Sequence, residues 1–442
     1  MKMQTIYDNM LRKRGKWMEI ETLKKSHLKR NIIIGVIVLA IISAIILNFT
    51  KAKYRVTESI PLVNGTINYS LADLNIMNIY IDGVEATELD STKQYTIDTT
   101  KSTCTNKDGS SINNLSIGYE SESRQLTISP YTTKGTKCTL YFEESVLVRD
   151  TLLANYPTQL TRSDFSTTVT NTTTGTIYYE DTSKGRTYYF AGNPTDNWVK
   201  FAGYYWRIIR INEDGSLRLI YQGTTTNSIG KGSQIETSTF NNSYNDNMYV
   251  GYMYTSGQVH GLGTDSTIKD VLDNWYTSNL QNYADKIDGN AGFCNDRMQH
   301  YGTGIGASST DYATYNRLIN NKIPSFECSN SNDLFTTKES SEGNKSLQYP
   351  IGLITADEVA YAGGVEGISN TSYYLYTNNE YWTMSPYRYK SNAFVFYVSS
   401  SGSLNSAKRV DASYGIRPVI NLKSTVQITG GNGLKDTPYI IN

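Results

Sequence analysis

The chain has 442 residues and equal numbers of basic and acidic side chains, 41 Lys and Arg against 41 Asp and Glu. The first thirty residues hold nine of the bases and three of the acids, which leaves 32 bases and 38 acids, a net charge of −6, in the rest of the chain. Nucleic-acid binding requires the opposite, a basic surface. We therefore expect no nucleic-acid partner, and the length allows two or three domains.

A nearly continuous apolar run, Ile32–Phe49, follows the basic segment. Its 18 residues would form a helix about 27 Å long, close to the hydrocarbon thickness of a bilayer. Basic residues concentrated before such a run favour a cytoplasmic N-terminus. The sequence therefore predicts a single-pass protein of the cell membrane whose bulk is extracytoplasmic. The alternative is a cleaved signal peptide, for which Thr50–Ala52 is the only passable cleavage site.

All four cysteines lie on the predicted outer side, and each sequential pair is separated by 34 positions: Cys104 with Cys138, and Cys294 with Cys328. Two local disulfides are the simplest interpretation, since the outside of a cell is oxidising. Other connectivities and free thiols stay open, because sequence alone cannot assign partners. A zinc site is the less favoured alternative, because the chain has no Cys-x-x-Cys motif.

Local patterns divide the chain beyond residue 54. Short β-type runs punctuated by Gly, Asn, Asp and Ser fill residues 54–144 and predict a small β-sandwich that acts as a spacer. Apolar residues at helical spacing in Val146–Asn155 predict a linker helix, within residues 146–160. Phe201–Ile211 and Leu217–Tyr221, on either side of a turn, predict a β-hairpin that opens the C-terminal domain.

Two helices are predicted after that hairpin. Apolar residues recur every three or four positions in Ser266–Tyr283. The second helix begins at Thr355, where Thr355 and Glu358 have the spacing of a capping box. Strands follow at Tyr381–Met384 and Ala393–Val398. The predicted fold class is therefore α+β: a single N-terminal transmembrane helix, a small β-sandwich, and a domain with two helices on an irregular antiparallel sheet.

Two motifs give this last domain a family resemblance: Trp382–Pro386, which reads Trp-x-x-Ser-Pro, and Gly415–Val419, which reads Gly-Ile-Arg-Pro-Val. Together with the hairpin at Trp206 and the helix from Ile354, they resemble an uncharacterised family of bacterial extracytoplasmic proteins over roughly residues 175–425. By analogy, the domain is similar to C-type-lectin-like and sulfatase-modifying-factor-like domains. The resemblance implies a lectin-like fold for residues 175–442 and carries no known function.

Several single residues have both a structural and a functional interpretation. Arg417 and Trp206 are expected to be structural, the arginine because a guanidinium beneath a sheet commonly binds carbonyls. Trp382 is a candidate sugar-stacking residue, although a core position is the stronger interpretation. The 36 tyrosines set among Ser, Thr, Asn and Gly resemble the composition of binding loops. Tyr387, Arg388, Tyr389 and Lys390 form the candidate ligand-binding cluster.

Enzymatic and metal-binding motifs find little support in the sequence. There is no Gly-x-Ser-x-Gly motif, and only His260 and His300 of the outer part can act as a histidine base. No spacing singles out a glycosidase carboxylate pair, and the calcium motifs of sugar-binding and EF-hand proteins are absent. We therefore predict no catalytic residue, no metal site and no cofactor.

The sequence as a whole predicts a membrane-anchored cell-surface protein that presents a non-catalytic domain for a glycan or protein ligand. The alternatives are an envelope-structural or self-associating protein and a cell-wall-modifying enzyme. The expected parts are a cytoplasmic basic tail (1–30), a transmembrane anchor (31–50), the spacer (54–144), the linker helix (146–160) and the ligand-binding domain (175–442).

Overall fold

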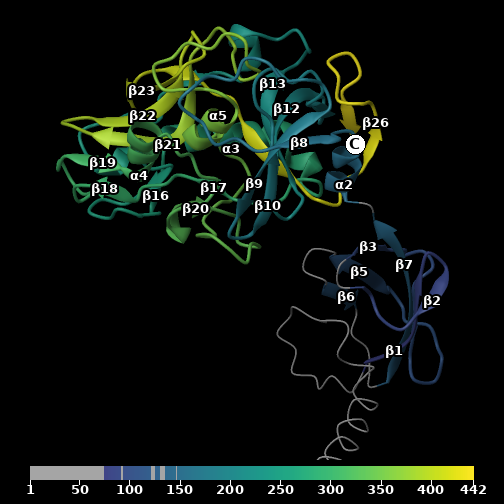
Figure 1. The fold of residues 1–442 in the computed structure, drawn as a ribbon. Coiled ribbons are helices and arrows are strands. Elements are labelled where there is room, and N and C mark those ends of the chain that lie inside the picture. The colour runs from purple at the N-terminus through teal and green to yellow at the C-terminus, as the bar shows by residue number, and fades with distance from the viewer. Residues whose placement is uncertain (1–73, 91–92, 121–124, 130–134, 146) are drawn as a thin grey trace, which may run out of the picture. The chain divides into compact units, whose positions relative to one another are not determined.

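A computed structural model describes residues 74–90, 93–120, 125–129, 135–145 and 147–442 (Figure 1). The predicted basic tail and membrane anchor lie outside the described residues. The chain divides into two compact units, Met1–Ser145 and Val146–Asn442. In the part that the structure describes, no helix is long and apolar enough to cross a membrane.

The first unit contains a mixed sheet of five strands and a separate two-stranded hairpin. The sheet has the order β2-β1-β7-β3, with β4 also pairing with β7, and only the β1–β7 pair is parallel. The strands are β1 (Leu74–Ile81), β2 (Val84–Ala86), β3 (Gln94–Ile97), β4 (Thr103–Thr105), β5 (Ser116–Glu120), β6 (Gln125–Ser129) and β7 (Thr136–Ser145).

The hairpin β5–β6 and the five-stranded sheet share one hydrophobic core. Leu126 and Ile128 of β6 are buried in the same cluster as Leu140 and Phe142 of β7. Cys104 and Cys138 face each other across β4 and β7 and form a buried disulfide. A small unit buries little apolar surface, so this cross-link adds stability that the core alone supplies poorly.

The second unit is built on two large sheets that lie toward opposite ends of it (Figure 1). The first has nine strands in the order β26-β27-β11-β12-β10-β9-β8, with β13 joining β12 to β25. Its strands are β8 (Thr158–Leu160), β9 (Thr176–Thr182), β10 (Gly185–Tyr189), β11 (Trp198–Phe201), β12 (Tyr204–Ile211), β13 (Leu217–Gly223), β25 (Val419–Leu422), β26 (Ile428–Gly430) and β27 (Tyr439–Ile441).

The second large sheet has seven strands in the order β14-β24-β21-β19-β18, with β22 pairing with both β21 and β23. Its strands are β14 (Thr237–Ser238), β18 (Gln299–Tyr301), β19 (Thr310–Tyr312), β21 (Tyr381–Tyr389), β22 (Ala393–Val398), β23 (Leu404–Arg409) and β24 (Tyr414–Gly415). Two short ladders complete the strands: β15 (Met253–Tyr254) with β16 (Thr264–Asp265), and β17 (Phe293–Cys294) with β20 (Leu334–Phe335).

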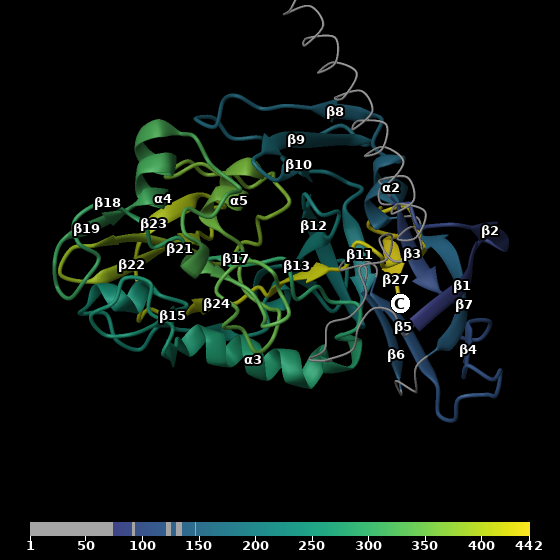
Figure 2. The ribbon, with the colours of Figure 1, turned by 90° about the horizontal axis from the view of Figure 1, so that it is seen from below.

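Helices are few and short in the described residues of this unit. They are α2 (Val148–Leu153), α3 (Thr267–Asn279), α4 (Ala313–Tyr315) with the π-helical turn η4 (Asn316–Asn321), α5 (Ala356–Tyr361), and the 3-10 turns η1 (Gly230–Ser233), η2 (Asn247–Val250), η3 (Gln281–Tyr283) and η5 (Ser331–Asp333). Ser266 caps α3, which lies on the opposite side of the unit from β8 and β9 (Figure 2). Val148 and Leu152 of α2 belong to the core of the second unit.

The predicted α+β, C-type-lectin-like fold is wrong. The described chain is mostly β, and its large sheets are mixed, with parallel pairs β8–β9, β11–β27 and β21–β24. Helix α5 does not lie on one sheet as a layer, because all six of its residues are buried. The local capping signal therefore located this helix correctly but did not show that it fills the core.

The predicted disulfide pairing is confirmed at both sites, Cys104 with Cys138 and Cys294 with Cys328. The second bridge begins on β17 and closes the segment that carries β18, β19, α4 and η4. Unlike the first bridge, its two cysteines are partly exposed.

Candidate functional site

Four side chains form a row across the seven-stranded sheet. Asp311 on β19 pairs with Arg388 on β21, Arg388 pairs with Phe394 on β22, and Phe394 pairs with Arg409 on β23. Residues paired in this way point to the same face of a sheet. All four side chains are partly or fully exposed. We call this set the cross-strand row, and it lies on the solvent side of the sheet.

Tyrosine rings enclose Arg388, which stands next to Asp311 at one end of the cross-strand row. Its guanidinium carbon lies 4.7 Å from the ring centre of Tyr315, on α4, and 4.3 Å from that of Tyr387. Tyr387 shares the face of Arg388 because a β-bulge separates the pairs Pro386–Val395 and Arg388–Phe394. Arg388 Nη2 donates to the Tyr387 hydroxyl. Partial burial raises the pKa of Tyr387, so this hydroxyl stays neutral.

The other end of the row repeats this arrangement with different partners. The guanidinium of Arg409 lies 3.9 Å from the ring centre of Tyr244. Its Nε and Nη2 atoms donate to the two carboxylate oxygens of Asp411, at 2.5 and 2.8 Å. Phe394 lies between the two arginines in register and is not a member of the core cluster. The row therefore has a half-buried ring, Phe394, with an arginine stacked on aromatic rings on each side of it.

The charges of the row are paired. Arg388 Nε is 3.8 Å from Asp311 Oδ1, close enough for an ion pair, but neither atom makes a hydrogen bond. Arg409 is paired with Asp411, as described above. The Nη1 atoms of both arginines donate to no residue that the structure describes. The row thus offers guanidinium donors, carboxylate acceptors and a ring face while carrying little net charge.

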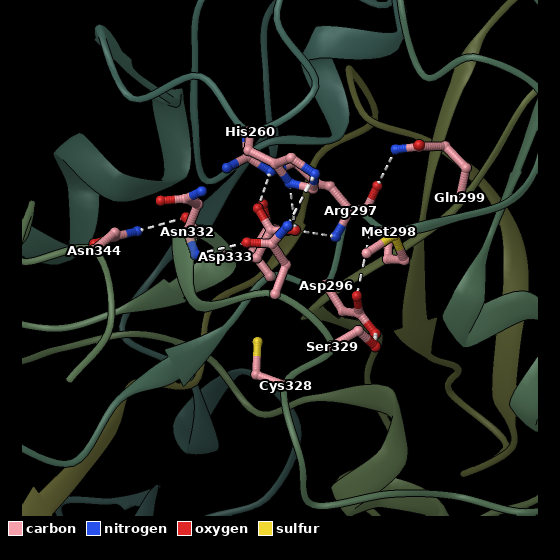
Figure 3. Close-up of polar contacts among 12 residues, drawn as sticks. His260, Asp296, Arg297, Met298, Gln299, Cys328, Ser329, Asn332, Asp333 and Asn344 are labelled. Atoms are coloured by element: carbon pink, nitrogen blue, oxygen red, sulfur yellow. Dashed lines mark hydrogen bonds and ion pairs between the residues drawn. The ribbon is translucent and has the colours of Figure 1, made fainter.

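A second polar cluster surrounds His260 and the carboxylate of Asp333 (Figure 3). His260 Nδ1 lies 2.9 Å from Asp333 Oδ2. Arg297 donates to the same carboxylate twice, from its backbone nitrogen at 2.7 Å and from Nε at 2.8 Å. Asp333 is fully buried and His260 is 24% exposed. The Arg297 side chain also donates to the carbonyls of Met253 and Gly261, so the cluster ties three loops together.

This histidine–aspartate pair lacks the third member that nucleophilic catalysis requires. His260 Nε2 lies 3.3 Å from Asn330 Nδ2, which can only donate. Nε2 is therefore the acceptor, and Nδ1 carries the proton that it shares with Asp333. Both ring nitrogens are engaged, and no hydroxyl or thiol of the described residues bonds to this histidine. This geometry fits a structural role, in which the cluster holds neighbouring loops together.

A carboxylate pair near this cluster is also fully engaged. Arg317 binds Asp296 at 2.7 Å and Asp357 at 3.0 and 3.1 Å. Ser329 donates to Asp296 at 2.8 Å, and burial raises the pKa of Asp296. A glycosidase needs one carboxyl free to protonate its substrate and another free to attack or activate water. Here one guanidinium holds both carboxylates. No group of three or more potential ligands among the described residues forms a metal site.

The structure separates the members of the predicted ligand-binding cluster. Tyr387 and Arg388 lie at the cross-strand row, and Lys390 is exposed in the turn after β21. Tyr389 is buried with its hydroxyl on the Asn245 carbonyl, because it points to the other face of the strand. Trp382 is also buried, and its Nε1 donates to Ser238 O at 2.9 Å. The rings of Tyr389 and Trp382 are therefore not presented to solvent.

Arg417 and Trp206, expected to be structural, both lie in the core. Arg417 is fully buried and donates to the carbonyls of Tyr221 and Leu375 and to the side chain of Gln222. Trp206 is also fully buried, and its Nε1 donates to Phe201 O at 3.1 Å.

Several members of the candidate site were not predicted from the sequence: Asp311, Tyr315, Phe394, Arg409 and Tyr244. A local signal existed for one of them, since the tight turn after Tyr389 sets Tyr389 opposite Ala393 and so places Arg388 near Phe394. Asp311, Tyr315 and Tyr244 belong to segments far from β21 in the chain, and no local signal indicates their approach. Arg409 lies on β23, which follows β22 after a short turn, but its register opposite Phe394 depends on a β-bulge that the sequence does not indicate.

Comparison with protein families covers part of this region. Residues 308–424 match a domain of unknown function, DUF6273. The DUF6273 segment contains both sequence motifs, Trp382–Pro386 and Gly415–Val419, and the whole cross-strand row. It begins well after residue 175, where the family resemblance was expected to start. No curated protein matches the chain, and no solved structure matches it. The comparisons give no evidence for a relationship to lectin-like or sulfatase-modifying-factor-like domains.

Proposed function

We propose that this chain is a membrane-anchored cell-surface protein whose second unit binds a glycan or protein ligand at the cross-strand row, without catalysing a reaction. The observation that carries the proposal is the stacking of Arg388 between Tyr315 and Tyr387, beside its ion-pair partner Asp311. Aromatic rings and arginine are enriched where proteins bind their partners. Stacking fixes the arginine in place, so little side-chain entropy is lost when a ligand binds.

The two disulfides support the outward location. Structural disulfides persist in oxidising compartments and are rare in the cytosol. One bridge lies in each unit, so both units are expected on the same, oxidising side of the membrane. The apolar run Ile32–Phe49 precedes both disulfides along the chain and supports a membrane anchor at that position.

The hydrogen bonding of the polar side chains supports a binding function and not a catalytic one. His260 and the Asp296–Asp357 pair are the best-placed candidates for acid–base chemistry, and each is already engaged by protein groups. The cross-strand row keeps donors available, at the Nη1 atoms of its two arginines. An available donor set beside ring faces is what ligand recognition needs.

The proposal is tested by saturation binding of the detergent-solubilised full chain to an array of glycans and cell-surface proteins. We expect saturable binding that weakens at least about tenfold, or about 1.4 kcal/mol, in Arg388→Gln and in Arg409→Gln. Lys338→Gln is the matched control, because Lys338 is an exposed cation whose ion pair with Glu339 is loose, at 3.8 Å. Self-association without binding to any probe, or binding that both arginine variants retain, would overturn the proposal.

A further inference from the structure

We infer that the ligand of the cross-strand row is an uncharged glycan that lies across the strands, with its hydroxyl groups on Arg388 and Arg409 and the face of a sugar ring on Phe394. This inference rests on the proposed function and names its ligand class. It follows from three properties of the row: its length, the balance of its charges and the position of its central ring.

The length of the row fits a short run of sugar rings. Neighbouring strands in a sheet are about 4.8 Å apart, so Arg388 on β21 and Arg409 on β23 stand about 10 Å apart at the backbone. The whole row, from β19 to β23, is about 14 Å wide. A stable protein interface needs about 800 Å² from each partner. The row crosses four strands and takes one residue from each, so it is long and narrow. Such a surface suits a narrow polar chain better than the broad face of a protein.

The balance of charges favours an uncharged ligand. Each arginine of the row already has a carboxylate partner, Asp311 for Arg388 and Asp411 for Arg409. An anionic ligand would have to compete with these carboxylates and would be repelled by them. A sugar hydroxyl is both a donor and an acceptor. It can accept from guanidinium Nη1 and donate to the neighbouring carboxylate, so it uses both members of each pair without adding charge.

The central ring completes the recognition. Phe394 is half-buried, lies outside the core cluster and pairs with an arginine on each side. A half-buried phenylalanine between two polar groups provides an apolar surface that the ring face of a sugar can cover, while the sugar hydroxyls at the ring edge reach the arginines. Tyr315, Tyr387 and Tyr244 already stack on the arginines, which leaves Phe394 as the platform.

The test measures the affinity of the detergent-solubilised full chain for three kinds of probe. The probes are neutral hexose and N-acetylhexosamine oligosaccharides, dextran sulfate as a polyanion, and cell-surface proteins. We expect binding to neutral oligosaccharides whose Kd changes less than about twofold between about 0.05 and 0.5 M NaCl, since screening acts mainly on charged partners. Phe394→Ala should weaken that binding about tenfold, and Phe394→Tyr should retain it.

Ile323→Ala is the control, because it removes a 65% exposed apolar side chain elsewhere on the unit. Thermal unfolding of each variant shows that the fold is kept. Preference for dextran sulfate, a steep salt dependence, or binding to proteins alone overturns the inference and leaves the proposed function standing. Neutral-glycan binding that Phe394→Ala leaves unchanged and Arg388→Gln weakens also overturns the inference and leaves the proposed function standing. If no probe binds saturably, both the inference and the proposed function fail.

Discussion

Glu358 is only 3% exposed and neutralises two arginines inside the second unit. Its Oε1 atom lies 2.5 Å from Arg218 Nε and 3.3 Å from Arg210 Nε. Its other oxygen accepts from the backbone nitrogen of Thr355. Charges removed from water are tolerated only when they are paired and hydrogen-bonded. This residue therefore couples helix α5 to strands β12 and β13, which supply the arginines.

Removing this carboxylate should destabilise the fold strongly. We expect Glu358→Gln to lower the free energy of unfolding by about 3–5 kcal/mol, because Arg218 stays buried without a counter-charge. Urea unfolding followed by circular dichroism measures the change. Glu339→Gln is the control, since Glu339 is 63% exposed and 3.8 Å from an exposed lysine, and it should change stability by less than about 0.5 kcal/mol. A loss below about 1 kcal/mol for Glu358→Gln would contradict the role assigned to this pair.

The same carboxylate makes stability depend on pH. Burial by itself raises the pKa of Glu358, but Arg218 and Arg210 outweigh burial, so the pKa lies below its usual 4.5. A carboxyl with a lowered folded-state pKa contributes stability that is complete above the unfolded pKa and is lost as pH falls toward the folded value. We expect the wild-type chain to lose this contribution below about pH 4.5, and Glu358→Gln to show a correspondingly flatter acid profile. Identical profiles would contradict the assignment.

At the scale of elements, helix α5 depends on its first turn. The Thr355 hydroxyl accepts from Glu358 N at 3.1 Å, and the Glu358 side chain accepts from Thr355 N at 2.9 Å. This capping box was predicted from sequence and is confirmed. Such a motif can be predicted because all of its atoms belong to four consecutive residues. The arginines that bind the same glutamate are about 140 residues away in the chain, and no local pattern indicates them.

Loss of the cap should have a moderate cost. We expect Thr355→Ala to lower the free energy of unfolding by about 1 kcal/mol, because the backbone nitrogen of Glu358 loses its acceptor. Thr355→Ser keeps the hydroxyl and should lie within a few tenths of a kcal/mol of wild type. Thermal or urea unfolding of the two variants gives the comparison. Equal stabilities would show that the cap is not needed once α5 is packed.

The two disulfides differ in access and not in loop length. Both join cysteines 34 positions apart, so loop closure favours each by a similar amount, about 3–4 kcal/mol. Cys104 and Cys138 are buried, whereas Cys294 and Cys328 are partly exposed. Thiol–disulfide exchange requires that the attacking thiolate reach a sulfur. We expect low dithiothreitol on the native chain, followed by alkylation and peptide mass spectrometry, to label Cys294 and Cys328 first. Earlier labelling of Cys104 and Cys138 would contradict this.

Helices, strands and disulfides were predicted correctly where neighbouring residues in the sequence carry the pattern. Helix α3, the hairpin β12–β13, the strands β21 and β22 and both disulfides were anticipated from periodicity, turns or spacing. Sheet order was not, because it depends on pairs such as Val199 with Tyr439, which lie at opposite ends of the second unit's sequence. The mistaken α+β fold and the missed Asp311 and Tyr315 have this common origin. The sequence located Tyr387 and Arg388, but it did not indicate that β19 and α4 supply Asp311 and Tyr315 beside them.

At the scale of the whole molecule, the proposed membrane anchor precedes both disulfides along the chain. We expect the full chain to stay in the membrane fraction after an alkaline wash, because an apolar helix of 18 residues does not dissociate with peripheral proteins. Its cysteines should resist maleimide until a reductant is added. Fractionation and maleimide labelling check these two points, and N-terminal sequencing shows whether the chain has been cleaved. A mature chain in the soluble fraction that begins near residue 50 would instead indicate a cleaved signal peptide.

Hydroxyl-radical footprinting of the detergent-solubilised full chain tests the central claim most directly, because it reports where a ligand lies without any mutation. The ligand is the neutral oligosaccharide that binds most tightly in the array, compared with ligand-free chain. We predict that binding protects Phe394, Tyr315 and Tyr387 from oxidation and leaves the exposed Tyr301 unchanged. Protection at other residues, with Phe394 and Tyr387 as reactive as before, would contradict the assignment of the cross-strand row as the binding site.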